Sequence, residues 1–354
     1  MIWKLFLLSV LSFALASLAL THTASAASRP RLLVLATGGT IAGSAPSPSD
    51  VTGYQAGVIG IDELLSAVPE NQSFAEVKGE QLCNIDSKDM TDEIWRQLAA
   101  RVNDILAKDE ADGIVITHGT DTMEETAFFL SLTVKSEKPV VMTGAMLPAT
   151  AKGADGPRNL LEAMRVAAHP ESADKGVLVV MNGKIFAAKE VTKTHTTKID
   201  AFSSPDFSPL GRIDNDGVIF ERTPNLPRLH FPAESALPRV DILYGHEGDD
   251  GALVEAALHA GAKGIVYAGM GNGSIPVKAE KALAKASEKG IVVVRASRSN
   301  SGAVLPAEPS YAAEGFIDGS VLNPQKARVL LRLALGQTMD QKEVQQIFRK
   351  YCAN

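Results

Sequence analysis

The 354-residue chain carries 41 acidic and 35 basic side chains, for a formal net charge of −6 at pH 7, and 45% of its residues are hydrophobic. The mildly negative charge and the scattered basic residues argue against a nucleic-acid-binding protein. A chain of this length exceeds what a single core usually supports, so two domains are expected.

The first residues predict a secretory signal peptide. Lys4 supplies a positive n-region, residues 5–20 form an apolar run, and residues 24–26 read Ala-Ser-Ala, an A-x-A cleavage site. The alternative is an uncleaved membrane anchor. No later stretch of the sequence is long and apolar enough to span a bilayer. We therefore expect cleavage after Ala26 and a periplasmic protein that does not remain in the membrane.

Strand-length apolar runs alternate with segments of helical periodicity along the chain. After a first strand that begins near Leu32, strands are expected at 113–117, 139–142, 176–181, 240–244, 264–268 and 291–294. Helices are expected at 123–133, 157–168, 253–260, 277–289 and 324–335. This alternation predicts an α/β protein of two domains, each a mostly parallel sheet flanked by helices.

A proline-rich stretch divides the two series of elements. Four prolines lie between Thr223 and Pro238, which is typical of a linker. The expected organisation is a signal peptide over 1–26, a larger N-terminal α/β domain over 27–222, a linker over 223–239 and a smaller C-terminal α/β domain over 240–354. Just before the linker, residues 214–217 (Asp-Asn-Asp-Gly) fit a hairpin turn better than a calcium loop, whose closing Glu is missing.

The first strand ends on Thr37-Gly38-Gly39-Thr40. A phosphate cradle, a structural turn and a nucleophilic threonine are all open interpretations, although the lysine of a phosphate loop is missing. Ligands of open α/β sheets bind beyond the carboxyl ends of the strands, so the hydroxyl of Thr40 could attack a carbonyl carbon. The small, polar stretch that follows, up to Tyr54, is expected to be either a lid or an exposed loop.

The next two strands also end on polar or glycine residues. In "ITHGTDTMEET", Thr120 and Asp121 occupy the strand-to-helix junction, where either residue type is ordinarily an N-cap. A cap alone does not account for the whole cluster at 118–122, and a carboxylate there could hold a ligand ammonium. The third strand ends in "VMTGAMLP", and backbone N–H groups of such a turn can form an oxyanion hole.

A lysine and two histidines are candidates for proton transfer. Lys193 lies among threonines in "KEVTKTHTT". This pattern fits an exposed β-ribbon, or a lysine that draws a proton from the hydroxyl of Thr120. His118 and His195 are not accompanied by the H-E-x-x-H or G-x-S-x-G motifs of zinc hydrolases and serine hydrolases, so those two classes lose support.

The chain has two cysteines, Cys83 and Cys352. An exported protein can form disulfides, but these two residues lie far apart in sequence and lack the spacing of metal ligands. A disulfide between them is left open, and no metal site is expected.

The same segments resemble the signatures of a known enzyme family. "ATGGTIAG" and "DGIVITHGTDTMEET" are similar to the two signature segments of bacterial type II L-asparaginases, the secreted asparaginase and glutaminase-asparaginase family. The resemblance continues through "VKGEQLCNIDSKDM", "KPVVMTGAM", "ADGPRNL", "VTKTHTT", "AGMGNGS" and "GFIDGSVLNPQKARVLL". It covers essentially the whole mature chain in the expected order.

The resemblance implies hydrolysis of the side-chain amide of L-asparagine to L-aspartate and ammonia, with possible activity on L-glutamine. It assigns Thr40 as the nucleophile and Tyr54 as the group that helps to move its proton. It places Thr120, Asp121 and Lys193 in a second catalytic cluster. The substrate-binding residues that it implies are Ser87, Lys88, Thr120, Asp121, Ala145, Asn272 and Glu308.

The resemblance also implies an assembly, a homotetramer built from intimate dimers. Asn272 and Glu308 would then enter the site of a neighbouring subunit, so the sites would lie at the dimer interface. Neither a metal ion nor a cofactor is implied.

Two departures from the family pattern bear on the substrate. Lys88 stands where many members carry Gln or Glu beside the substrate's α-amino group, and like charges at contact range repel by roughly 1–4 kcal/mol. The segment before Glu308 is also shorter than in other members. The alternatives are a primary glutaminase-asparaginase, since one methylene is worth only about 1–3 kcal/mol, and, from another class, a periplasmic amino-acid-binding protein.

Overall fold

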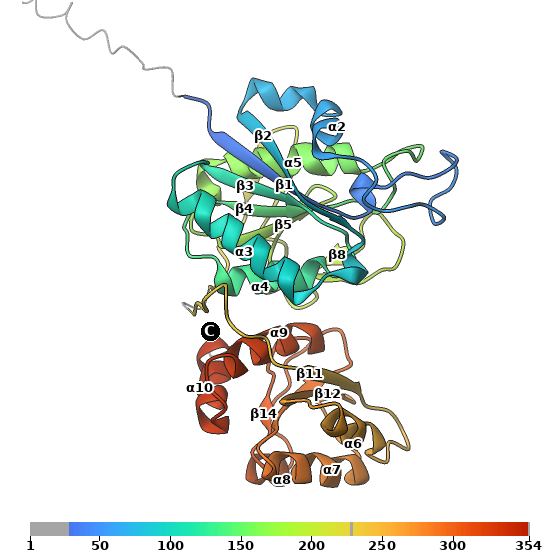
Figure 1. The fold of residues 1–354 in the computed structure, drawn as a ribbon, viewed down its shortest axis with the longest axis vertical. Coiled ribbons are helices and arrows are strands. Elements are labelled where there is room, and N and C mark those ends of the chain that lie inside the picture. Colours follow the sequence, from blue (N-terminus) through green and yellow to red (C-terminus); the bar gives the residue numbers. More distant parts are fainter. Residues whose placement is uncertain (1–27, 227–228, 353–354) are drawn as a thin grey trace, which may run out of the picture.

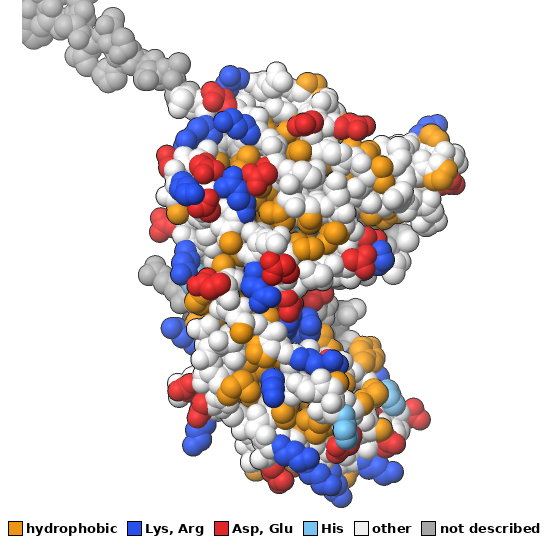
Figure 2. Space-filling view, viewed as in Figure 1, with side chains coloured by type: hydrophobic (Ala, Val, Ile, Leu, Met, Phe, Trp, Pro, Cys, Tyr) orange, Lys and Arg blue, Asp and Glu red, His pale blue; other side chains and the backbone are white. Residues whose placement is uncertain are grey.

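The computed structural model describes residues 28–226 and 229–352, so the predicted signal peptide lies outside the described residues. Two α/β domains, the larger one N-terminal, are stacked along the long axis of the molecule (Figure 1). This confirms the predicted fold class. Across these described ranges, no helix combines the length and apolar character that crossing a bilayer requires. Acidic and basic side chains are interspersed over the face shown in Figure 2.

The larger domain is built on one eight-stranded sheet with the order β10-β9-β6-β5-β4-β3-β1-β2. Its parallel strands are β1 (Arg31–Gly38), β2 (Glu76–Ile85), β3 (Gly113–Thr117), β4 (Val140–Thr143) and β5 (Val177–Met181). Its antiparallel strands are β6 (Lys184–Ala187), β9 (Gly211–Asp214) and β10 (Gly217–Phe220). The strand order reverses between β1 and β3, and a ligand crevice is expected beyond the carboxyl ends of strands at such a point.

Helices cover both faces of this sheet (Figure 1). Leu35 of β1 joins a core with α3 (Asp92–Ala107) and α4 (Met123–Thr133). Its neighbour Val34 joins the opposite core with α2 (Ile61–Ser66) and α5 (Gly156–Ala168). Successive side chains of a strand point to opposite faces of the sheet, and here helices cover both faces. A central strand such as β3 is therefore apolar along most of its length.

The smaller domain has a parallel sheet of β11 (Val240–Tyr244), β12 (Gly264–Gly269), β13 (Val292–Ser297) and β14 (Ile317–Asp318). Its helices are α6 (Ala252–His259), α7 (Val277–Glu288), α8 (Pro309–Ala313), α9 (Pro324–Leu335) and α10 (Gln341–Cys352). Helices α6 and α7 pack on one face of this sheet. Helices α9 and α10 pack on the other and share a core with the larger domain.

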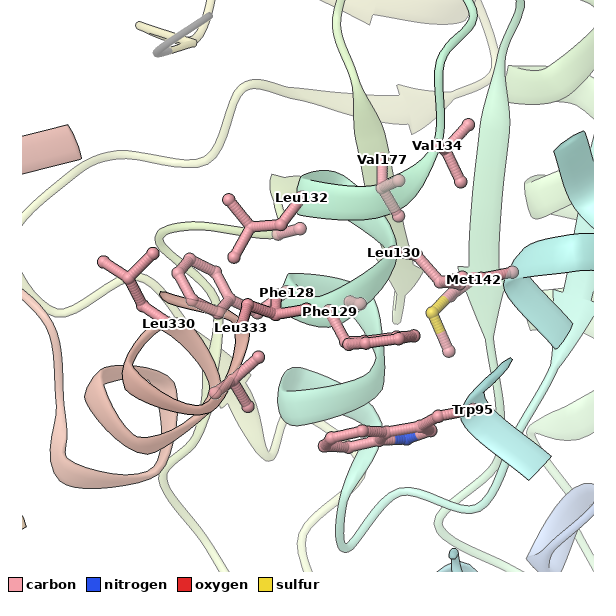
Figure 3. Close-up of a cluster of buried hydrophobic side chains, with 14 of the residues drawn as sticks. Trp95, Phe128, Phe129, Leu130, Leu132, Val134, Met142, Val177, Leu330 and Leu333 are labelled. Carbon is pink, nitrogen blue, oxygen red and sulfur yellow. The ribbon is translucent and has the colours of Figure 1, made fainter. Parts of the chain in front are cut away.

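The two domains meet where α9 lies against α4. Leu330 and Leu333 of α9 approach Phe128 of α4, as Figure 3 shows. On the other side of α4, Phe129 stacks on Trp95 of α3 with ring centroids 4.9 Å apart. Helix α4 is therefore held between the larger sheet and the smaller domain.

The predicted elements correspond closely to the observed ones. Residues 113–117, 123–133, 240–244 and 324–335 form the expected strand or helix with the expected bounds, and the other predicted elements shift by at most a few residues at their ends. The hairpin at 214–217 is confirmed by the pairing of Asp214 with Gly217. Strand β2 was not predicted, because it is an edge strand whose many exposed polar residues break the apolar pattern.

Candidate active site

The glycines at the ends of β1 and β3 pack backbone against backbone. Gly39 has φ +81°, and a Cβ there would lie 2.4 Å from the Cα of Gly119. A Cβ on Gly119 would in turn lie 2.7 Å from the hydroxyl of Ser87, in the short 3-10 helix η3 (Ser87–Asp89). The glycines therefore let three segments converge at the strand-order reversal, and Thr40, Thr120 and Ser87 lie on these segments at or next to the points of contact.

Thr40 begins the 3-10 helix η1 (Thr40–Ala42), and its side chain is almost completely buried. Its Oγ1 lies 2.6 Å from the hydroxyl oxygen of Tyr54. The loop between them folds back on itself through two backbone hydrogen bonds of 2.9 Å between Ser44 and Gln55. Gly43 leaves room for the tyrosine, since a Cβ there would lie 2.9 Å from the Tyr54 ring. The loop thus places a phenol beside a buried threonine hydroxyl.

Lys193 lies on a two-stranded ribbon formed by β7 (Thr192–Lys193) and β8 (Phe202–Ser203). Its ammonium donates to Oγ1 of Thr120 at 2.9 Å and to Oδ1 of Asp121 at 2.5 Å. The lysine side chain is 15% exposed, whereas that of Asp121 is 60% exposed. The segment is therefore a β-ribbon, as one interpretation expected, and it places the lysine within hydrogen-bonding distance of Thr120.

Ser87 and Lys88 adopt different environments although they are adjacent. The Oγ of Ser87 is buried and has no hydrogen-bond partner among the described residues. The ammonium of Lys88 is exposed and lies 2.6 Å from Asp86 and 3.4 Å from Asp89. The hydrogen bond to Asp86 is the main reason that the pKa of Lys88 is raised. The carboxylates of Asp86 and Asp89 thus lie beside the Lys88 ammonium, which the family resemblance put next to the substrate's α-amino group.

In the turn after β4, two backbone N–H groups already donate hydrogen bonds within the protein. Asp155, at the start of α5, accepts hydrogen bonds from the backbone N–H groups of Met146 and Leu147 at 2.9–3.1 Å. Asn159 donates to the carbonyl of Gly144 at 3.0 Å. The expectation that N–H groups of this turn form an oxyanion hole is therefore wrong for Met146 and Leu147. The turn is held rigidly, with Ala145 fully buried within it.

Asn272 and Glu308 lie in the smaller domain. The side chain of Asn272 exchanges hydrogen bonds with the backbone of Leu305, at 2.8 and 3.2 Å. Glu308 is exposed and precedes α8, which lies at the end of the molecule away from the larger domain (Figure 1). Within the described part of this chain, the structure brings Thr40, Tyr54, Thr120, Asp121 and Lys193 together with Ser87, but not these two residues.

Within the described residues, neither candidate histidine forms a hydrogen bond with Thr40 or Thr120. His195 accepts hydrogen bonds from the backbone amides of Thr197 and Lys198, both at 3.1 Å. His118 is fully buried, its Nδ1 lies 2.7 Å from the carbonyl oxygen of Gly119, and burial lowers its pKa to about 4. Burial therefore favours the neutral form of His118.

The low pKa of His118 predicts sensitivity to acid. In the unfolded chain the imidazole takes up a proton near its ordinary pKa of 6.5, whereas in the folded chain it does so only near 4. The unfolded state binds more protons between these values, so stability is complete above pH 6.5 and falls by about 3 kcal/mol as the pH drops to 4. Urea unfolding of wild type and His118→Asn at pH 7 and pH 4.5 measures this loss.

The variant is expected to lose less of its unfolding free energy between the two pH values than wild type. His246→Asn is the matched control, because His246 is exposed. An identical pH dependence for wild type and His118→Asn would contradict this explanation.

Outside residues 1–27, 227–228 and 353–354, no group of three or more His, Cys, Asp or Glu side chains is placed to hold a metal ion. Cys83 and Cys352 are both free thiols in the structure. Sequence reasoning missed Asp155, which binds the turn after β4, and Glu124, which binds β7; neither belongs to a glycine turn. The signals for Asp155 were its place before Gly-Pro at the start of a helix and the resemblance of "ADGPRNL" to the family, which assigned it no role.

Comparison with known proteins finds matches over most of the chain. Residues 31–226 match the family model described as "Asparaginase, N-terminal", and residues 239–348 match "Glutaminase/Asparaginase C-terminal domain". The chain is 48% identical over 329 residues to "L-asparaginase 2" of Bacillus subtilis (strain 168), covering 91% of this chain and 87% of that protein.

Two further proteins are similarly close. "Probable L-asparaginase periplasmic" of Haemophilus influenzae is 48% identical over 335 residues, which cover 93% of this chain and 95% of that protein. The crystal structure titled "Probable Cytoplasmic L-asparaginase from Campylobacter jejuni" superposes with a TM-score of 0.88 at 48% identity. It covers 91% of this chain and 100% of the Campylobacter chain.

Proposed function

Because this chain belongs to the asparaginase family, we propose that it hydrolyses the side-chain amide of L-asparagine to L-aspartate and ammonia through an acyl-enzyme on Thr40. The observation that carries the proposal is the pairing of two buried threonines with a phenol and an ammonium at the adjoining ends of β1 and β3. Thr40 is paired with Tyr54, and Thr120 is paired with Lys193.

The first half of the reaction forms the acyl-enzyme. Oγ1 of Thr40 attacks the carbon of the substrate carboxamide, and its hydroxyl proton passes to the Tyr54 oxygen across their 2.6 Å contact as the phenol releases its own proton toward the departing nitrogen. The C–N bond then breaks, and the nitrogen takes up a proton and leaves as ammonia. An ester between Thr40 and the aspartyl group remains. Covalent catalysis divides one difficult displacement into two easier ones.

The second half hydrolyses that ester. A water molecule attacks the acyl carbon and loses a proton, the ester bond breaks, and Thr40 recovers its hydroxyl proton. Thr120, Lys193 and Asp121 form the cluster beside it that can relay protons, since their side chains are joined at 2.9 and 2.5 Å. Holding the groups in this geometry is worth several kcal/mol by itself, within the ~7–11 kcal/mol available from orientation.

The charged end of the amino acid fits the remaining groups of the crevice. The unpartnered hydroxyl of Ser87 is suited to donate to the α-carboxylate. The exposed carboxylate of Asp121 is suited to accept from the α-ammonium. A buried polar atom without a partner is costly, so the Ser87 hydroxyl supports a polar ligand at this place. The Ala145 carbonyl lies in the wall that would receive the amide.

Asn272 and Glu308 act in this proposal on a neighbouring subunit of a homotetramer, whose sites lie at the intimate dimer interface. Their placement in the smaller domain, apart from Thr40, supports this assignment. Export to the periplasm by the predicted signal peptide is also part of the proposal. The Haemophilus influenzae relative, named as a probable periplasmic L-asparaginase, supports it.

A primary glutaminase-asparaginase is the second candidate. It is favoured by the match of residues 239–348 to the family model "Glutaminase/Asparaginase C-terminal domain". An amino-acid-binding protein has no need of two paired hydroxyls, and no finding favours it. The test is ammonia release by the purified chain from L-asparagine and from L-glutamine, with kcat/KM measured for each. Absence of ammonia from both amides would refute the proposed activity, and a higher kcat/KM for glutamine would select the second candidate.

Lys88→Gln is expected to lower KM for L-asparagine by about 2- to 10-fold at low ionic strength and to leave kcat nearly unchanged. The variant removes a cation and leaves Asp86 and Asp89 uncompensated, so the field near the substrate ammonium becomes more negative. Salt should suppress the difference because these charges are exposed. Kinetics with both amides at two salt concentrations, with exposed Lys184→Gln as control, measure it. A KM equal to wild type would show that Lys88 does not act on the substrate.

A further inference from the structure

We propose that Glu124 is a positioning residue through which the smaller domain of the same chain holds Lys193 against Thr120. This inference rests on the proposed function, in which Lys193 takes part in proton transfer. Glu124 lies in the first turn of α4, three residues after Asp121, and its side chain is buried. It does not touch Thr40, Thr120 or Asp121 through any hydrogen bond within the described residues, so its effect must be indirect.

One oxygen of Glu124 binds both residues of β7. Oε2 accepts a hydrogen bond from the backbone N–H of Lys193 at 2.7 Å. It also accepts a short hydrogen bond from the hydroxyl of Thr192. The carboxylate thereby fixes the backbone from which the Lys193 side chain extends.

The other oxygen of Glu124 binds the smaller domain. Oε1 accepts from the side-chain amide of Asn323 at 3.0 Å and from that of Gln325 at 2.6 Å. Asn323 is the N-cap of α9, where its Oδ1 accepts from the backbone N–H of Lys326 at 3.0 Å. A single buried carboxylate therefore joins the first turn of α4, the ribbon that carries Lys193 and the first turn of α9.

The donor set favours a carboxylate at this position. Four hydrogen bonds converge on its two oxygens, from the Thr192 hydroxyl, the backbone N–H of Lys193 and the side-chain amides of Asn323 and Gln325. An ionised carboxylate is acceptor-only and satisfies all four, whereas a carboxamide of the same shape turns an NH2 group toward two of the donors. Glu124→Gln therefore disrupts either the β7 side or the α9 side without changing the side-chain volume.

A second contact from α9 holds the same segment. The buried ammonium of Lys326 donates to the carbonyl of Lys189 at 3.1 Å and, through a short hydrogen bond, to the carbonyl of Val191. These residues lie directly before β7. The first turn of α9 thus holds the segment before Lys193 from one side while Glu124 holds Lys193 itself from the other.

The ribbon needs this support because it is small. Strands β7 and β8 contain two residues each and belong to neither large sheet. Two-stranded hairpins are marginal by themselves, and Lys193 extends a flexible four-carbon chain from this backbone. A shift of about 1 Å in a catalytic group can cost about 100-fold in rate. The position of the ammonium beside Thr120 is therefore set by Glu124 and the smaller domain.

The test compares Glu124→Gln with Asp92→Asn in the full-length protein. Asp92 also joins the two domains, through an ion pair with Arg332 at 2.8 Å, but makes no contact with the ribbon. Glu124→Gln is expected to lower kcat for L-asparagine about 10- to 100-fold, with KM within about 3-fold of wild type and a changed pH profile of kcat. Asp92→Asn is expected to lower the Tm with kcat within about 2-fold of wild type.

Two outcomes would overturn the inference. Wild-type kcat in a folded Glu124→Gln variant would show that the carboxylate does not position Lys193. An equal loss of kcat in Asp92→Asn would show that only domain docking matters. If Glu124→Gln does not fold, Asn323→Ala and Gln325→Ala serve instead, and each must lower kcat at least about 3-fold at unchanged KM. Failure of the proposed function is distinct, because then wild type itself releases no ammonia.

Discussion

Replacing Thr40 by Ala is expected to abolish ammonia release while the fold and the binding of L-aspartate are retained. The hydroxyl forms the covalent bond in the proposed mechanism. Among the described residues, it is the group to which the Tyr54 hydroxyl is hydrogen-bonded. We expect kcat to fall by at least about 1,000-fold, or about 4 kcal/mol in activation free energy. Steady-state ammonia release and titration with L-aspartate measure the two effects separately.

Two controls accompany this variant. Thr40→Ser keeps a hydroxyl and should recover part of the activity. Thr37→Val removes a hydroxyl of the same turn that donates to the carbonyl of Thr117 at 2.8 Å, and it should change stability more than kcat. Turnover near the wild-type rate in Thr40→Ala would refute the assignment of the nucleophile.

Replacing Lys193 by Met should produce the second-largest loss, about 100- to 10,000-fold in kcat, as expected when a proton-transfer group is removed. Methionine keeps much of the aliphatic chain but leaves the Thr120 hydroxyl and the Asp121 carboxylate without the ammonium. Asp121 is 60% exposed, so the ion pair should contribute at most about 1 kcal/mol to stability. Thermal unfolding should therefore change little while kcat collapses.

A charge-conserving variant separates charge from proton transfer at this position. Lys193→Arg keeps a cation, but a guanidinium does not give up a proton in proteins, so this variant should be nearly as inactive as Lys193→Met. Lys198→Met, at an exposed lysine of the same segment, should retain full activity. If Lys193→Arg kept most of the wild-type kcat, the lysine would act through its charge alone.

Many of the strands and helices, and the glycine-threonine turns of the site, could be predicted because their signals are local, whereas β2, α3 and α10 were missed. Continuous apolar runs identify strands buried on both faces, and glycine-threonine turns at their ends mark a crevice between β1 and β3. Resemblance to the asparaginase family then named Thr120, Asp121 and Lys193, which the structure brings within hydrogen-bonding distance. Spacing alone could not pair Lys193 with Thr120, because 73 residues separate them.

The parts that could not be predicted depend on contacts between distant segments. Glu124 looks like an ordinary acidic residue in a first helical turn, and its partner Gln325 lies 201 residues away in the other domain. Lys88 invited an argument about the substrate, but its nearest charges are carboxylates of its own turn. In both cases the role of the side chain depends on which donors and acceptors lie around it in the folded protein. The pattern of residue types along the sequence does not give that information.

The backbone contact between Gly39 and Gly119 constrains how this site can be redesigned. Because a Cβ at either position would collide with its neighbours, these two positions, the floor of the proposed site, offer no side chain for mutation to vary. Laboratory evolution toward a longer or shorter amide should therefore accumulate changes around the rim, in the Tyr54 loop and beside Ser87, where a new side chain can be accommodated. Libraries that randomise the floor should yield mostly misfolded proteins.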